Sequence, residues 1–281
     1  MKRVLTIALF VLIFLIGFAV LIYPAVSDYY NSLRHIRAVD EYFKAVGALS
    51  EKDYTEILIA ANAYNERLLH NPNRFTMTDE EMVEYRSLLN PSGKDIIGTL
   101  EIEVIDINLP IYHGTNESVL QIGLGHLEGS SLPVGGIGTH AVITGHRGLP
   151  SSSLLTNLDR MILGDTFKIK VLNENLFYRV DQIKIVKPHE TSALAIDKSK
   201  DYCTIITCTP YGINTHRLLV RGYRIEGYAS ETYVRPTRIP KEARVLNAPY
   251  SALFIIVPVT FTVLIILFIR LRRVYGRGKK Q

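Results

Sequence analysis

The stretch CTIITCTPYGINTHRLLVRGYR, residues 203–224, contains two apolar segments on either side of a turn. The first segment, CTIITC, is rich in β-branched residues and is predicted to form a strand. A proline, a glycine and an asparagine then supply turn chemistry, and RLLVRG is predicted to form the next strand. Because only eight residues separate Cys208 from Arg217, we expect these two side chains to converge on one site.

Both cysteines of the chain, Cys203 and Cys208, lie in this stretch. Five strand steps of about 3.3 Å place their Cα atoms roughly 16 Å apart, whereas a disulfide requires less than about 7 Å. Their odd spacing also directs the two side chains to opposite faces of the strand. We therefore predict no disulfide, a packing role for Cys203 and a separate role for Cys208.

Short apolar or alternating runs continue this pattern over residues 96–225, with turn residues between them. The earlier runs are IIGTLEIEVIDINLPIY from Ile96, HAVITG from His140, TFKIKVL from Thr166 and LFYRVDQIKIV from Leu176. No repeated long helix separates most of them, which favours a closed or nearly closed β-barrel over a doubly wound α/β sheet. The predicted fold class is therefore mainly β.

Residues 27–95 precede the predicted barrel and are expected to be mainly helical. SEKD from Ser50 and TDEE from Thr78 are typical of helix starts, and Glu81 completes a capping box with Thr78. After the barrel, residues 226–248 contain two prolines and are interpreted as a tether.

Uncharged apolar segments occur near both ends of the chain, at residues 4–23 and 252–269. Each approaches the roughly 20 residues that a helix needs to cross a bilayer. Basic residues flank the outer end of each segment, so the positive-inside bias predicts cytoplasmic termini and an extracytoplasmic domain between the spans. We interpret residues 1–26 as a flank and membrane anchor, and residues 249–281 as a second span with a basic tail.

A cleaved signal peptide is the alternative interpretation of the first apolar segment, with Ala25-Val26-Ser27 as a weak cleavage site.

The charge distribution agrees with two membrane flanks. The chain has a formal net charge of +5, but the two flanks hold eight basic and no acidic residues, which leaves 24 basic against 27 acidic residues between them. The positive charge therefore does not indicate a nucleic-acid partner.

Cys208 is a candidate nucleophile, since the thiolate is the reactive form of cysteine and a nearby cation favours it. Arg217 could serve in this way, or it could stabilise the oxyanion of an acyl-transfer intermediate. A cysteine nucleophile also needs a proton carrier. His146 ends the apolar run AVIT; His216 is closer in sequence, but alternation directs it away from Arg217. On the residues alone, packing explains Cys208 as well as catalysis does.

The segments TGHRG around His146 and TCTPYGINTHRLLVRG around Cys208 and Arg217 closely resemble the active-site segments of sortases, the membrane-anchored cysteine transpeptidases of Gram-positive bacteria. LPIYHGT, GHLEGSSLPVGG and TGHRGLP resemble the class C, pilus-assembling branch of that family. The resemblance covers about residues 96–225, and several long motifs occur in the same order.

This resemblance implies a closed sortase-type β-barrel, with N-terminal helices and a transmembrane helix at each end. It makes Cys208 the nucleophile that attacks the threonine carbonyl of a Leu-Pro-X-Thr-Gly-like sorting signal. His146 protonates the departing amine, and Arg217 binds the substrate or the oxyanion. A lysine amine of the next pilin subunit then resolves the thioacyl enzyme and forms an isopeptide bond. Thr207 also matches the family pattern, and this chemistry requires no cofactor or metal.

One segment departs from the class C pattern. Many class C sortases carry a lid before the barrel, with an Asp-Pro-aromatic motif that covers the active site. The corresponding region here contains Asn71, Pro72 and Asn73 without that triplet, and Phe75 is the candidate aromatic residue. The lid is therefore degenerate or absent, and we do not carry the autoinhibition mechanism over.

Other functions fit parts of the same sequence. A sortase that anchors surface proteins to cell-wall peptide, or a hydrolytic cysteine protease, would use the same three residues. A non-catalytic surface scaffold at the membrane would leave His146 and Arg217 without a reason to accompany Cys208. The expected partners are pilin or surface-protein substrates, an acceptor lysine and the membrane.

Overall fold

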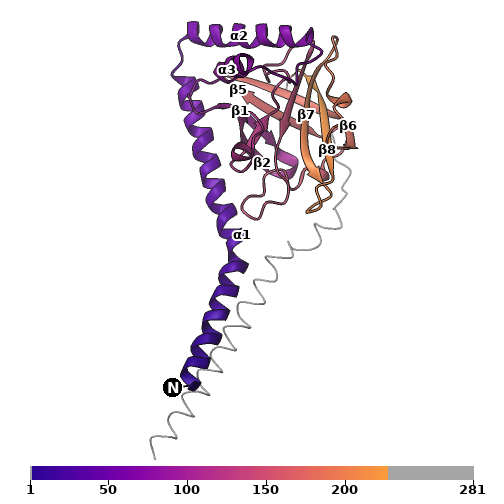
Figure 1. The fold of residues 1–281 in the computed structure, drawn as a ribbon. Helices are drawn as coiled ribbons and strands as arrows, with labels where there is room; N and C mark the ends of the chain where they lie inside the picture. Colours follow the sequence, from indigo (N-terminus) through magenta and orange to yellow (C-terminus); the bar gives the residue numbers. More distant parts are fainter. Residues whose placement is uncertain (1, 227–281) are drawn as a thin grey trace, which may run out of the picture. The chain divides into compact units, whose positions relative to one another are not determined.

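Three helices precede the barrel in the computed structural model, which describes residues 2–226. They are α1 (Lys2–Gly47), α2 (Glu51–Leu69) and α3 (Asp79–Ser87), as Figure 1 shows. The Ser50 side chain accepts a hydrogen bond from the Asp53 N–H at the start of α2. Thr78 and Glu81 form a reciprocal capping box at the start of α3. Both predicted helix starts are confirmed.

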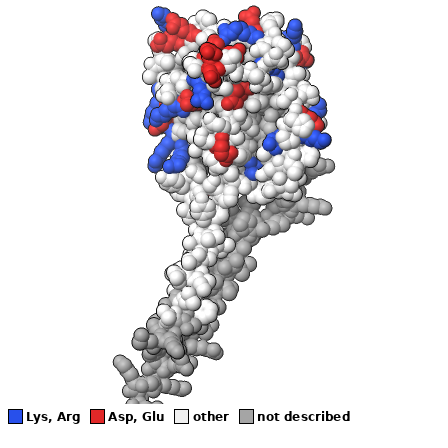
Figure 2. All heavy atoms as spheres, viewed as in Figure 1, with Lys and Arg blue, Asp and Glu red and all other residues white. Residues whose placement is uncertain are grey.

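Helix α1 joins the apolar N-terminal segment to the barrel without interruption, although it contains Pro24. Among the described residues it is the one helix that is long and apolar enough to cross a membrane. Figure 2 shows its lower part as an uncharged surface beneath the charged surface of the barrel region. The boundary predicted between residues 26 and 27 thus falls inside one continuous helix.

Eight strands follow and close into a barrel with the order β1-β2-β3-β4-β7-β8-β6-β5. The strands are β1 (Ile96–Ile102), β2 (Ile107–His113), β3 (Leu124–His126), β4 (Thr139–Thr144), β5 (Thr166–Val171), β6 (Glu174–Val186), β7 (Asp201–Thr209) and β8 (His216–Ile225). Most neighbours are antiparallel, but β2 pairs with β3, and β4 with β7, in parallel. The predicted closed barrel is confirmed.

The strands differ from the predicted runs at two places. The first run splits into β1 and β2, because the 3₁₀ turn η1 (Glu103–Ile105) and Asp106, at a φ of 55°, reverse the chain. Strand β3 was not predicted, since three residues are too few to display an alternating pattern.

Alternating side chains of the strands fill the barrel interior, as Phe167 and Ile169 of β5 do. Tyr42 of α1 is buried against this barrel. Its hydroxyl donates a hydrogen bond to the Ile97 carbonyl and accepts one from the Leu172 N–H. The upper part of α1 is therefore attached to the barrel by buried polar contacts as well as by apolar packing. The predicted tether beyond residue 226 and the predicted second span lie outside the described residues.

Candidate active site

Cys208 and Arg217 are direct cross-strand neighbours. The antiparallel register of β7 and β8 pairs Cys208 with Arg217. Directly opposed residues have Cβ atoms about 5 Å apart and side chains on the same face of the sheet. The hairpin predicted from residues 203–224 is therefore present, and it places Cys208 and Arg217 side by side on one face of the sheet.

The two cysteines lie on opposite faces of β7. Cys203 is fully buried in the barrel core, and this burial raises the pKa of its thiol well above the ordinary value. Cys208 is half-buried, five residues further along the strand, and both thiols are free. The predicted absence of a disulfide and the packing role of Cys203 are confirmed.

His146 follows β4, the strand that lies against β7 on the side opposite β8. Beyond the end of β4, the Gly145 N–H donates to the Ile206 carbonyl at 3.1 Å. The buried Thr207 hydroxyl donates to the Gly145 carbonyl at 2.8 Å. These two bonds lie just beyond Thr144–Ile206, the last register pair of β4 and β7, and hold the segment that carries His146 against the end of β7 that carries Cys208. Thr207 thus ties the His146 segment to β7.

The other candidate histidine, His216, lies on a different face. It pairs with Thr209, one register position away from the Cys208–Arg217 pair. Because side chains alternate along a strand, His216 points away from the face that carries Cys208 and Arg217. The register therefore directs His216 away from the thiol, whereas the segment that carries His146 is held against the same end of β7.

The turn between β7 and β8 holds the arginine. Arg217 Nη1 donates to the carbonyls of Asn214, at 3.2 Å, and His216, at 3.1 Å. Gly212 and Asn214 in this turn have positive φ angles of 75° and 60°, which explains a glycine and an asparagine at these positions.

Glu117 is a further residue beside His146, and the sequence analysis did not identify it. It begins the short helix α4 (Glu117–Leu120), which Asn116 caps. His146 Nε2 lies 3.3 Å from Glu117 Oε1, and Gln121 Nε2 donates to the same oxygen at 2.5 Å. The Gln121 hydrogen bond and then the nearby His146 lower the pKa of Glu117. The capping asparagine was a visible signal for a helix start, but nothing in the sequence linked it to His146.

The segment after His146 packs against the β7–β8 turn. A Cβ at Gly148 would lie 2.9 Å from the Tyr211 ring, so the close approach requires a glycine. The Arg147 guanidinium lies 5.8 Å from the centre of the same ring and forms an ion pair with Asp159. The segments that carry His146 and Arg217 therefore support each other.

A second apolar cluster packs on the outer face of the barrel and forms a strip near the site. It consists of Val142, Leu194, Ile206 and Leu219, all of which are buried. Ile206 lies two residues before Cys208 on the same face of β7, so the strip begins next to the thiol. Leu194 ends the 3₁₀ turn η3 (Ser192–Leu194) in the β6–β7 connection and forms one wall of the strip.

The candidate lid forms consecutive turns between α2 and α3 and comprises Asn71, Pro72, Asn73 and Phe75. Arg74, in the middle of this segment, is buried. Its guanidinium donates to the Gly129 carbonyl at 2.7 Å and to the Leu194 carbonyl at 2.6 Å, and it lies 4.2 Å from the centre of the Phe75 ring. Arg74 therefore attaches the segment to η3, the wall of the apolar strip.

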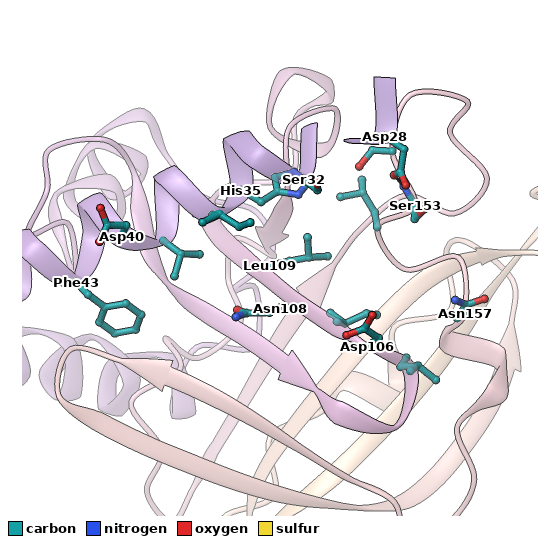
Figure 3. Close-up of a pocket in the computed structure, with 16 residues that line it drawn as sticks. Asp28, Ser32, His35, Asp40, Phe43, Asp106, Asn108, Leu109, Ser153 and Asn157 are labelled. Carbon is teal, nitrogen blue, oxygen red and sulfur yellow. Dashed lines mark hydrogen bonds between the residues drawn. The ribbon is translucent and has the colours of Figure 1, made fainter. Parts of the chain in front are cut away.

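A groove of about 850 Å³ lies away from Cys208, between α1 and β2 (Figure 3). Its lining includes Asp28, His35 and Asn157. In the described part of the chain, no group of three His, Cys, Asp or Glu side chains is arranged to hold a metal ion.

Comparison with known proteins defines the family. Residues 100–225 match the sortase domain. The structure is similar to that of sortase C1 from Streptococcus agalactiae, with a TM-score of 0.66 and 48% identity, over 68% of this chain and 99% of that one. Sortase D of Bacillus subtilis (strain 168) is 25% identical over 153 residues, which are 53% of this chain and 74% of that protein. The chain belongs to the sortase family, whose members are cysteine transpeptidases.

The similar structures also indicate a branch of that family. Sortase C of Clostridium perfringens, solved with the C-terminal cell wall sorting motif, has a TM-score of 0.60 and 37% identity, over 68% of this chain and 100% of that one. Together with the S. agalactiae enzyme, it confirms the resemblance to class C, pilus-type sortases.

Proposed function

We propose that this chain polymerises pilins, by cleaving a Leu-Pro-X-Thr-Gly-like sorting signal and transferring the acyl group to a lysine amine. The observation that supports the proposal is the register of β7 and β8, which pairs Cys208 with Arg217, together with the hydrogen bonds that hold the His146 segment against β7. The similarity to class C sortases supports the choice of pilins over other surface proteins.

In the first half-reaction, the Cys208 thiolate attacks the threonine carbonyl carbon of the sorting signal. Arg217 stabilises the oxyanion that develops on the carbonyl oxygen. The bond from threonine to glycine then breaks, and His146 donates a proton to the departing glycine amine. The products are a thioester on Cys208 and the released C-terminal fragment of the substrate.

In the second half-reaction, a lysine amine of the next pilin attacks the thioester carbonyl. His146 accepts the proton that the amine loses, and the C–S bond breaks to regenerate the Cys208 thiolate. The new amide joins the threonine carbonyl to the lysine side chain. No net oxidation or reduction occurs, so the reaction needs no cofactor.

The same proposal includes the location of the enzyme. Residues 4–23 of α1 span the membrane, and the barrel lies on the extracytoplasmic side, as the basic N-terminal flank indicates. Substrates held at the membrane by their own C-terminal segments then share a surface with the enzyme.

The test uses the full chain in liposomes with candidate pilins. The wild type should produce a ladder of products that resists SDS, and Cys208→Ala should abolish it. His146→Ala should also abolish the ladder, whereas Cys203→Ala and His216→Ala, the matched controls, should retain it. Single anchored products without a ladder would favour attachment to cell-wall peptide instead, and a ladder from Cys208→Ala would refute the mechanism.

A further inference from the structure

Helix α1 is bound to the barrel immediately above its apolar segment. Asp28 Oδ1 accepts a hydrogen bond from the Ser153 N–H at 2.6 Å, and Asn31 Nδ2 donates to the Ser151 carbonyl at 2.8 Å. Figure 3 shows Asp28 and Ser153 facing each other between the helix and the barrel segment. Asp28 is only five residues beyond Tyr23, where the uncharged segment ends.

A third contact lies one turn further along α1, where His35 Nε2 is 2.9 Å from the Ile122 carbonyl oxygen. At the rise of an α-helix, the three contacts lie about 8, 12 and 18 Å beyond Tyr23. Pro24 lies on the membrane side of all three, so a bend at this proline would move the upper helix and the barrel together. The barrel therefore has one fixed position along the helix.

The two barrel segments that α1 holds both adjoin His146. Ser151 and Ser153 belong to the connection that follows His146, and the Leu155 N–H of that connection donates to the His146 carbonyl at 3.1 Å. Ile122 follows α4, whose Glu117 contacts the His146 ring. The helix thus fixes the position of the active-site end of the barrel in particular.

We infer that α1 is a spacer of fixed length that sets the distance from the bilayer to the active site, and thereby selects substrates whose sorting signal lies close to their own membrane span. The inference rests on the proposed function, including the insertion of residues 4–23 in the membrane. An extended peptide covers about 3.3 Å per residue, so about three to six residues bridge a height of about 10–20 Å.

A flexible tether between the membrane span and the barrel would not select substrates by the distance of their sorting signal from the membrane. The end-to-end distance of a flexible linker varies over a broad range, and a barrel on such a linker would accept sorting signals at many heights. Here the helix continues from the apolar segment to the barrel, and three polar contacts fix the barrel on it. Spacer length in the substrate should therefore matter as well as the sequence of the signal.

The experiment uses the full chain in liposomes, with model substrates that carry the signal at increasing distances from a membrane span. A soluble signal peptide is measured in parallel. The test variant carries seven helix-forming residues between Ala25 and Val26. Seven residues make nearly two helical turns, so Asp28 stays on the side of α1 that faces the barrel. The barrel then lies about 10 Å further from the membrane. The matched control carries the same insertion between Arg3 and Val4, before the apolar segment.

We expect the spacer with maximal turnover to lengthen by about three residues in the test variant and to stay unchanged in the control. Cleavage of the soluble peptide should stay within twofold in both. An unchanged optimum with intact peptide cleavage would overturn the inference and leave the proposed function standing. Failure of the wild type to cleave the soluble peptide would instead contradict the proposed function.

If the insertion abolishes cleavage of the soluble peptide, a second variant tests the inference instead. The double substitution Asp28→Ala and Asn31→Ala removes the two polar contacts nearest the membrane without lengthening the chain, while those of His35 and Tyr42 remain. We expect it to broaden the dependence on spacer length, because the barrel is then less firmly fixed on α1. A dependence as sharp as that of the wild type would overturn the inference.

Discussion

Cys203 and Cys208 share a strand but differ in their access to solvent. Cys203 has no exposed surface and a raised thiol pKa, whereas Cys208 is half-buried on the outer face. A small alkylating reagent should therefore modify one thiol per folded chain. Intact-mass measurement should show that Cys208→Ala loses this label and that Cys203→Ala keeps it. Labelling of Cys203 before unfolding would contradict its packing role.

The carboxylate of Glu117 should assist His146 by holding its ring. Glu117→Gln replaces a charged acceptor with a neutral one in an exposed contact. We expect acyl transfer to slow by about two- to fivefold, without a measurable change in the free energy of unfolding. Steady-state kinetics with a signal peptide measures this. Glu56→Gln, in an exposed ion pair on α2, is the matched control, and an equal slowing there would refute the role.

The sequence supports the three proposed catalytic residues to different degrees. The proximity of Cys208 and Arg217 could be predicted from strand and turn chemistry, because it depends on a local hairpin. His146 was one of two histidine candidates on the residues alone, and the family resemblance implied its role, since a parallel pairing of strands separated by more than 50 residues leaves no local signal. Glu117 was missed because its contact with His146 depends on where α4 packs.

At the scale of elements, Arg74 joins the segment between α2 and α3 to the β6–β7 connection. Arg74→Ala would leave the buried carbonyls of Gly129 and Leu194 without these donors, at a cost of about 2–3 kcal/mol. Chemical denaturation should detect this loss in the free energy of unfolding. Arg67→Ala removes an exposed ion pair with Glu84 and a contact at 6.0 Å with the Tyr64 ring, and should cost less than about 1 kcal/mol. Equal losses in the two variants would contradict the bridging role of Arg74.

Elements with a strong local pattern were predictable. The helix starts at Ser50 and Thr78 carry capping signals, and most strands show β-branched or alternating runs. The short strand β3 has no such pattern, since its position depends on pairing with β2 and β4. The buried position of Arg74 could not be predicted from the sequence either, because a charged residue in a turn is normally expected in solvent.

At the scale of the whole molecule, two buried histidines should make the fold sensitive to acid. Burial lowers the pKa of His126 and of His140 to about 4. The unfolded chain, with an ordinary pKa of 6.5, binds more protons between these values, so stability falls as the pH falls from 6.5 towards 4. Each histidine contributes roughly 3 kcal/mol to this loss at most.

Unfolding free energies measured between pH 7.5 and 4.5 test this expectation. His140→Gln should flatten the slope, because its ring lies between the Ala195 carbonyl and the Thr204 hydroxyl only in the folded state. The exposed His189→Gln should leave the slope unchanged. A stability that does not vary across this range would refute the contribution of the buried rings.

The closure of the barrel also limits how a peptide can bind by its main chain. Strand β7 pairs with β8 up to Thr209 and with β4 up to Ile206, so both hydrogen-bonding edges of β7 are occupied up to Ile206. An extended peptide cannot join this part of β7 as an added strand, which is a common way for proteins to bind extended peptides. On the β4 side, strand pairing ends before the last three residues of β7, which include Cys208. Main-chain pairing of an extended peptide with β7 is therefore confined to the short end of the strand that carries the thiol.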